Sequence, residues 1–247
     1  AGYDGILVSG AADAPVYLWV TGEQVEIRPA PHLWGVDTYD VDALLKAETA
    51  SRAVVLAIGP AGERLSRLAA VMNDGHDGRA AARAGLGAVM GSKRLKAIVV
   101  FGTLPMPIAH PDALMQAVKQ TAPVINERTR SRRDFGTAGG VLPAAAIGDA
   151  PIKNWTLGTW DRFEKISGQW MAETILKGKY FCAACTIGCG REVEVASGPY
   201  APVKGSGPEY ETLVSLGSMC LVDDLEAVAL GNELCNRYGL DTISTGG

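Results

Sequence analysis

The sequence predicts an α+β protein in which a β-rich N-terminal domain is followed by a mainly α-helical domain. Short runs rich in β-branched residues, separated by Gly, Ala and Asp, fill the first hundred or so positions. Beyond three closely spaced prolines, apolar residues recur at helical spacing. These prolines are Pro105, Pro107 and Pro111. We therefore expect one domain over residues 1–107 and a second over residues 108–247.

The N-terminal domain is expected to contain six strands and one helix. The expected strands are Gly5–Ser9, Val16–Val20, Gln24–Arg28, Ala53–Ile58, Leu68–Met72 and Lys96–Phe101. Thr21-Gly22 predicts a hairpin turn between the second and third of them. Ala53–Ile58 is a continuous apolar run, which is typical of a buried strand. Asp40–Ala50 has helical spacing and no breaker, so it predicts a helix.

The second domain is expected to contain four longer helices. They are Asp112–Glu127, Ser167–Leu176, Glu211–Met219 and a helix that begins at Asp223 and ends before Gly239. Asp223 and Glu226 have the spacing of a capping box, and Gly239 is a natural left-handed stop. Pro123 disturbs the first helix, and Arg128–Asp134 predicts a short charged connection.

Composition and charge exclude several classes of protein. The 23 basic and 27 acidic residues give a net charge of −4, without the clustered positive field of a nucleic-acid surface. No apolar run reaches the roughly 18 residues that a membrane span requires, and no signal peptide is visible. The chain does not begin with Met and ends in two glycines, so both ends resemble cut points.

Three cysteines form the strongest motif, namely Cys182, Cys185 and Cys189. A cubane iron–sulfur cluster needs several thiolates on a short loop that wraps around it. Gly188 and Gly190, beside the third cysteine, allow such a loop to turn and approach closely. Five cysteines in total make a poor disulfide framework, so a metal site in a reducing, cytoplasmic setting is the favoured interpretation.

Two other interpretations of these cysteines stay open at this point. Zinc binds the same thiols, although structural zinc sites usually have two separated pairs or a Cys/His mixture. Alternatively, the three cysteines are unrelated buried residues. A cluster also needs a fourth ligand, for which Cys220 and Cys235 are candidates by identity alone. Both lie in apolar helical stretches, where a free core cysteine is the commoner outcome.

Two polar segments are weaker candidates for ligand binding. Arg79 and Arg83 lie four apart in a stretch rich in small residues, where a backbone can approach a ligand and guanidinium groups can hold phosphate. The stretch has neither a Rossmann nor a Walker pattern, and a tight turn with solvated arginines explains it as well. Gly239–Thr242 follows a capped helix, and a simple helix exit explains it.

Glu211 stands just before an apolar helix. A buried glutamate there would be suited to proton transfer. A carboxylate favoured by the helix dipole is the simpler interpretation from the residues alone.

Taken together, the motifs resemble the aldehyde:ferredoxin oxidoreductase family, in the family's order and over nearly the whole chain. The matching strings are Ala1–Asp4, Ile58–Glu63, Met72–His76, Gly87–Lys93, Cys182–Gly190, Gly207–Glu211 and Gly239–Gly247. Family members are much longer, so the chain resembles a fragment that lacks both terminal parts. The resemblance implies a β-rich base for two pterins, followed by mainly helical domains.

The resemblance also implies roles for individual residues. Cys182, Cys185 and Cys189 match three ligands of a 4Fe–4S cluster, whose fourth ligand lies outside this chain. Glu211 matches a glutamate near the metal that is a proposed proton carrier. The positions that match pterin-binding segments are Arg79, Ala80, Ala82, Arg83, Asn236, Leu240 and Asp241. Asn236 replaces the family's aspartate, and Asp77 and Gly78 are inserted before Arg79.

The implied activity is oxidation of an aldehyde to a carboxylic acid at a tungsten (or molybdenum) bis-pterin centre. Electrons would leave through the cluster to ferredoxin or an iron–sulfur partner subunit, and a homo-oligomer is compatible with the sequence. The alternatives are an acyl-CoA reductase subunit of the same superfamily, a non-catalytic electron-transfer module and a zinc-stabilised interaction domain. An electron carrier would not need the arginine and Gly-Leu-Asp segments.

Overall fold

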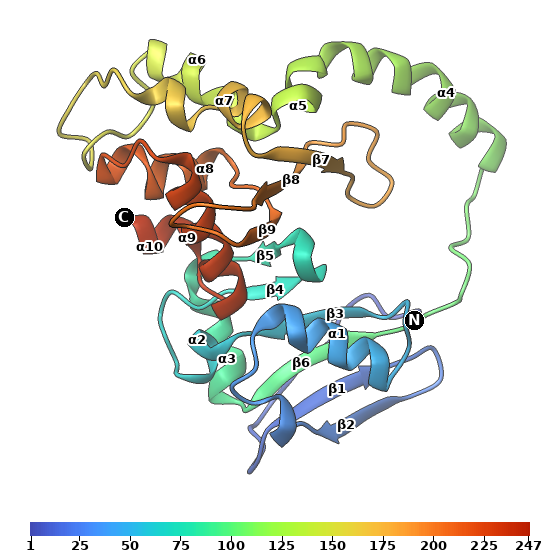
Figure 1. The fold of residues 1–247 in the computed structure, drawn as a ribbon. Coiled ribbons are helices and arrows are strands. Elements are labelled where there is room, and N and C mark those ends of the chain that lie inside the picture. Colours follow the sequence, from blue (N-terminus) through green and yellow to red (C-terminus); the bar gives the residue numbers. More distant parts are fainter. The chain divides into compact units, whose positions relative to one another are not determined.

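The computed structural model describes all 247 residues and divides into two compact units (Figure 1). Unit 1 consists of Ala1–Pro105 and Leu234–Thr245, and unit 2 consists of Met106–Glu233 and Gly246–Gly247. Both units contain helices and strands, which confirms the α+β class. The limits 1–107 and 108–247 stay a prediction for the full-length protein. None of the helices combines the length and apolarity that crossing a membrane requires.

A six-stranded mixed sheet forms the centre of unit 1, in the order β2-β1-β6-β3-β4-β5 (Figure 1). The strands are β1 (Val16–Val20), β2 (Val25–Pro29), β3 (Val54–Ile58), β4 (Val71–Asn73), β5 (Arg79–Ala81) and β6 (Leu95–Val100). β1 pairs with β6 in parallel, and every other pair is antiparallel. Five expected strands are present, β1 with the expected limits and the other four with shifted ends. Gly5–Ser9 is not a strand, because β2 and β6 already occupy both sides of β1.

Side chains along β1 alternate between the two faces of this sheet. Tyr17 and Trp19 belong to a buried cluster with Val41 and Leu45 of α1 (Thr38–Glu48). Leu18 and its neighbours on the opposite face pack with α3 (Leu86–Ser92). Successive side chains of a strand point to opposite faces, so each helix covers one face of the sheet. The other helices within residues 1–105 are short: α2 (Pro60–Glu63) and the 3-10 turns Pro31–Leu33, Gly75–Asp77 and Arg83–Gly85.

Unit 2 combines helices with a small antiparallel sheet in the order β7-β8-β9. The strands are β7 (Leu176–Tyr180), β8 (Gly190–Val195) and β9 (Val203–Ser206). The helices are α4 (Pro111–Arg128), α5 (Arg130–Phe135), α6 (Val141–Ala146), α7 (Gly168–Glu173) and α8 (Tyr210–Leu216), with 3-10 turns at Thr137–Gly140, Phe163–Ile166 and Ser218–Cys220. The expected connection Arg128–Asp134 is wrong, because α5 occupies most of it. The three strands were not expected.

The last two helices are α9 (Leu225–Tyr238) and α10 (Thr242–Gly246). The cap of α9 differs from the expectation by one residue. The carboxylate of Asp224 accepts from the amides of Glu226 and Ala227 at 3.0 and 3.2 Å. Asp223 instead pairs with Lys165 at 3.1 Å, and this ion pair removes it from the capping role. Gly239 ends α9 with φ of 69°, as expected.

Candidate cofactor-binding site

The three clustered cysteines lie on the connection between β7 and β8. Tyr180 pairs with Gly190 at the base of this hairpin, so residues 181–189 form its loop. Cys182 is exposed, and Cys185 and Cys189 are partly buried. Two loop residues, Ala184 and Gly188, have left-handed φ values of 56° and 64°. A Cβ on Gly188 would stand 2.4 Å from the Phe181 ring, so only glycine allows this turn.

Side chains from α4 and α5 hold the middle of the cysteine hairpin. The hydroxyl of Thr186 donates to the amide oxygen of Asn126 at 2.8 Å. Arg133 donates to the backbone carbonyl of Thr186 at 3.3 Å. Thr186 stands between the second and third cysteines, so these contacts restrain the loop around the thiols. Sequence reasoning missed both residues, because their partners are far along the chain.

The base of the hairpin is held by Arg191, which is only 3% exposed. Its guanidinium donates to the carbonyls of Gly188, Cys189 and Gly190 at 2.7 to 3.1 Å. Burial lowers the pKa of Arg191 from its ordinary value, and the nearby Cys189 and Glu209 oppose that shift. An arginine nevertheless stays protonated in proteins. The only signal in the sequence was its position two residues after the third cysteine.

The chemistry of the donors fits a 4Fe–4S cluster. All three thiols are free, and the amide of Ile187 donates to Cys185 Sγ at 3.5 Å, the kind of N–H···S contact that tunes such clusters. No group of three or more Cys, His, Asp or Glu side chains is arranged around a single ion position. In a cubane each cysteine binds a different iron, so its ligands stand farther apart than those of one ion.

The two remaining cysteines have other surroundings. Cys220 is exposed, and its thiol donates to the carbonyls of Ser215 and Gly246 at 3.4 and 3.2 Å. Cys235 is buried in unit 1, and desolvation raises the pKa of its thiol. Neither residue lies on the cysteine hairpin.

The arginine segment expected at the pterins forms an edge hairpin of unit 1. β5 pairs with β4 so that Arg79 faces Asn73 and Ala80 faces Met72. The 3-10 turn Gly75–Asp77 and Gly78, with φ of 58°, make the connection. The inserted residues Asp77 and Gly78 therefore lie in this turn. Beyond β5, Ala82 is partly buried and Arg83 is exposed.

The second expected pterin segment is attached to the stretch just before β4, because the backbone after α9 returns to residues 68–70. Leu240 forms a β-bridge with Ala69. The amide of Ala70 donates to Gly239 at 2.8 Å, and that of Asp241 donates to Leu68 at 2.9 Å. Residue 71 begins β4, so this bridge continues into the β4–β5 hairpin. Both segments are therefore attached to one stretch of unit 1, residues 68–73.

Asn236 and Asp241 are both buried within unit 1. The backbone carbonyl of Asn236 accepts from Thr38 Oγ1 at 2.8 Å. The carboxylate of Asp241, 2% exposed, accepts from the amides of Ile243 and Ser244 at 3.3 and 3.1 Å and from the Ser244 hydroxyl. Asp241 thus caps α10.

Glu211 lies in the first turn of α8 in unit 2 and is exposed. Glu209 stands at the N-cap position of this helix, but its side chain accepts no hydrogen bond from a helix amide. The hydroxyl of Thr137 donates to Glu209 and also accepts from the amide of Tyr210 at 2.9 Å. The Glu209 side chain is therefore held by Thr137, whose hydroxyl accepts from the first amide of the helix.

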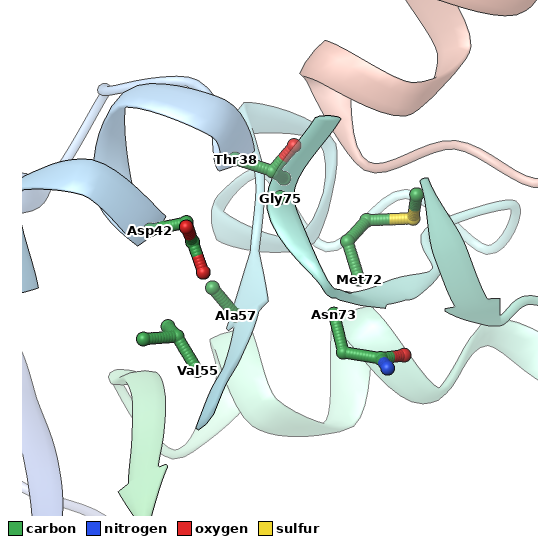
Figure 2. A pocket seen from close by; sticks show the side chains of 7 residues that line it. All are labelled: Thr38, Asp42, Val55, Ala57, Met72, Asn73 and Gly75. Atoms are coloured by element: carbon green, nitrogen blue, oxygen red, sulfur yellow. The ribbon is translucent and has the colours of Figure 1, made fainter. Parts of the chain in front are cut away.

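A narrow hollow lies beside the Met72–His76 string, between α1 and strands β3 and β4 (Figure 2). The Asp42 side chain points into it from α1. Its Oδ2 accepts from Lys46 at 2.7 Å, while its buried Oδ1 has no hydrogen-bond partner. The hollow is too narrow for a water molecule, so it is a packing feature and not a substrate cavity.

These observations define a class of protein: an α+β chain with a clamped cysteine hairpin in one unit and, in the other, two segments attached to the backbone of residues 68–73. Residues 1–102 match the aldehyde ferredoxin oxidoreductase N-terminal domain, and residues 113–247 match domains 2 and 3 of the same family. The chain belongs to the aldehyde ferredoxin oxidoreductase family.

Curated relatives agree with this assignment. The chain is 42% identical to the tungsten-containing aldehyde ferredoxin oxidoreductase of Pyrococcus furiosus and 41% identical to that of Thermococcus kodakarensis. Each match covers the whole chain but only 40% of the relative, so the chain spans about two fifths of their length. It is also 30% identical to an aliphatic sulfonate oxidoreductase, WOR-like subunit, of P. furiosus.

A solved structure shows the same fold. The BamBC active-site complex of benzoyl coenzyme A reductase superposes with a TM-score of 0.74. This match covers 94% of the present chain and 37% of that chain, at 23% sequence identity. At that identity the likeness concerns the fold alone.

Proposed function

We propose that this chain is part of an enzyme that oxidises an aldehyde to a carboxylic acid at a tungsten bis-pterin centre. Electrons then leave through a 4Fe–4S cluster to ferredoxin or a partner subunit. Membership of the family and the names of the tungsten-containing relatives support the proposal. The observation that carries it is the attachment of two segments, which an electron-transfer module alone would not need, to one backbone stretch of unit 1, residues 68–73.

Residues of unit 1 would bind the pterins. Arg79 and Arg83 offer planar donors for phosphate or ring heteroatoms, and Ala80 and Ala82 leave room for a flat ligand. Asn236, Leu240 and Asp241 would supply the second contact surface. When bound, the metal–pterin group supplies the two-electron chemistry of the oxidation. The protein orients that group and excludes competing reactions.

Glu211 would move the proton that leaves the substrate. The first turn of a helix favours a carboxylate anion, because exposed N–H groups there carry partial positive charge. An ionised carboxylate is a proton acceptor, and a positioned acceptor contributes about 10²–10⁴-fold to a rate.

Residues of unit 2 would hold the electron-transfer group. Cys182, Cys185 and Cys189 would each bind one iron of the 4Fe–4S cluster, with the fourth ligand in a part of the protein outside this chain. Cys182 is exposed in this chain, whereas Cys185 and Cys189 are partly buried.

Metal analysis of the full-length protein, purified without oxygen, tests the proposal. We expect about four irons and about one tungsten or molybdenum per chain. Iron alone would instead indicate an electron-transfer module. Zinc alone would indicate a zinc-stabilised domain.

Substitution of the proposed proton carrier tests its role in turnover. Glu211→Gln should retain both metals and lose at least about 100-fold in aldehyde turnover, because the amide cannot accept the proton. The matched control is Glu173→Gln, an exposed carboxylate at the end of α7, which should turn over normally. Normal turnover by Glu211→Gln would exclude this role.

A further inference from the structure

Arg191 makes more hydrogen bonds than a surface ion pair would explain. Its guanidinium donates to five different backbone carbonyls: Gly188 at 2.7 Å, Cys189 at 3.1 Å, Gly190 at 3.0 Å, Asp134 at 2.8 Å and Arg133 at 2.9 Å. All five acceptors are neutral oxygens. Hydrogen bonds from a charged donor are roughly twice as strong as neutral ones, and burial increases the difference.

The five acceptors come from two elements that are far apart in the sequence. Gly188, Cys189 and Gly190 belong to the cysteine hairpin. Arg133 and Asp134 belong to the last turn of α5, whose carbonyls have no partner within the helix. A cation at this helix end is favoured by the dipole. Arg191 therefore ties the loop around the third cysteine to a fixed helix end.

Packing leaves little space for this arrangement to change. A Cβ on Gly136 would lie 3.0 Å from the Cys189 carbonyl and 3.3 Å from the Arg191 side chain. A Cβ on Gly207 would lie 3.0 Å from Arg191 Cβ. The amide of Gly207 also donates to the Arg191 carbonyl at 2.7 Å. The Gly207–Glu211 segment is thus attached to the same residue.

We propose that Arg191 is a positioning residue that orders the backbone around Cys189 before iron binds, and whose buried charge raises the reduction potential of the cluster. The proposal rests on the proposed function, since it assumes a 4Fe–4S cluster on the cysteine hairpin. A loop that is already ordered loses less conformational entropy when it binds its ligand. A nearby positive charge stabilises the more negative, reduced cluster.

The test separates the hydrogen-bonding fork from the charge. Arg191→Lys keeps the charge and loses the planar fork, whereas Arg191→Met loses both. Arg130→Lys and Arg130→Met are the matched controls, because Arg130 is an exposed arginine at the start of α5. All variants are made in the full-length protein. The readouts are iron retention against a chelator, the reduction potential of the cluster by EPR-monitored titration, and amide hydrogen exchange of residues 184–190 after iron removal.

We expect both Arg191 variants to lose iron, and to exchange the loop amides, about tenfold faster or more than the wild type, since several charge-assisted bonds are lost. Only Arg191→Met should also lower the reduction potential clearly. The Arg130 variants should match the wild type. If Arg191→Met fails to fold by circular dichroism, the Lys variant still tests the clamp.

Iron retention and loop exchange at wild-type rates in Arg191→Lys would overturn the positioning role. An unchanged potential in Arg191→Met would overturn the electrostatic role. A wild-type protein without iron would instead overturn the proposed cluster. The hydrogen exchange of the loop amides needs no metal, so it would still decide whether Arg191 clamps the hairpin.

Discussion

Lys96 on β6 is fully buried in unit 1, where its ammonium group is hydrogen-bonded and ion-paired. Its Nζ donates to the carbonyl of Val36 at 2.9 Å and to the Glu63 carboxylate. The other oxygen of Glu63 accepts from the amide of Gly35 at 2.8 Å. Buried ions need such complete pairing, because an unpaired charge in the interior is costly. The pair fixes the loop that leads into α1.

Removing one partner of this pair should therefore destabilise the protein strongly. We expect Lys96→Met to lower the free energy of unfolding by about 3–5 kcal/mol, because Glu63 is left buried and unpaired. The double variant Lys96→Met/Glu63→Gln should recover part of the loss. Urea unfolding measures the change, with the exposed Lys119→Met as control. A loss in Lys96→Met no larger than in the control would contradict this account.

The same residue predicts a pH dependence. Burial is the main cause that lowers the pKa of Lys96 from its ordinary value of 10.5, although Glu63 opposes the shift. Between the lowered pKa and 10.5 the unfolded chain binds the proton more tightly than the folded one. The free energy of unfolding should therefore rise with pH across that window. Stability curves of the wild type and Lys96→Met should differ there in slope, and parallel curves would refute the prediction.

At the scale of elements, α2 and α3 approach each other at glycines. A Cβ on Gly91 would stand 1.9 Å from the Gly62 carbonyl, and one on Gly62 would stand 2.8 Å from the Gly87 carbonyl. The contacts are with backbone atoms, which cannot rotate away. All three of these glycines lie in strings that resemble the family, and their local role is close packing.

Gly91→Ala should consequently separate the two helices and cost about 1–3 kcal/mol of stability. Gly5→Ala is the control in the same unit, because nothing lies within 4 Å of its added Cβ. Thermal unfolding of both variants measures the difference. Equal melting temperatures would mean that the helices adjust without cost.

The cap of α10 separates a structural from a ligand-binding role of Asp241. Asp241→Asn retains an acceptor for the amides of Ile243 and Ser244, so we expect little loss of stability. Asp241→Ala should cost about 1 kcal/mol. If the carboxylate contacts a pterin, both variants should lose bound pterin in fluorescence assays of the oxidised cofactor. Full pterin content in Asp241→Asn would leave only the capping role.

Helices and strands were predictable from the sequence where the local residue pattern agreed with the tertiary packing. β1 has the predicted limits, because an apolar run precedes a clear turn. β7 contains two lysines and a glycine, and it becomes a strand only because β8 pairs with it. For a similar reason, the arginine-rich segment of α5 was not recognised as a helix. Tertiary pairing decided these segments.

The candidate site was predictable to the same extent. The cysteine spacing identified the hairpin loop, and the family resemblance identified the pterin segments. Asn126, Arg133 and Arg191 were not foreseen, because their contacts join residues more than 50 positions apart. Such partners are set by the tertiary fold and leave no local pattern.

At the scale of the whole molecule, the segment between β6 and α4 is the exposed link between the two units. No helix or strand covers residues 101–110, and Leu104 and Met106 are 64% and 83% exposed. Thermolysin should cleave the native protein there first, since exposed loops are preferred sites of nicking. Mass spectrometry of the first fragments measures this. Initial cleavage within β6 would contradict it.

Unit 1 is discontinuous, and this has a consequence for synthesis on the ribosome. Its strand β4 is followed by more than a hundred residues before Leu240 arrives to bridge Ala69. Residues 106–233 of unit 2 must therefore be synthesised before the backbone of residues 68–70 can pair with that of residues 239–241. Domains usually mature in the order of translation, from the N-terminus onward. Here the N-terminal unit is completed only after residues 106–233 of unit 2, and the surface proposed for the pterins cannot accept them until then.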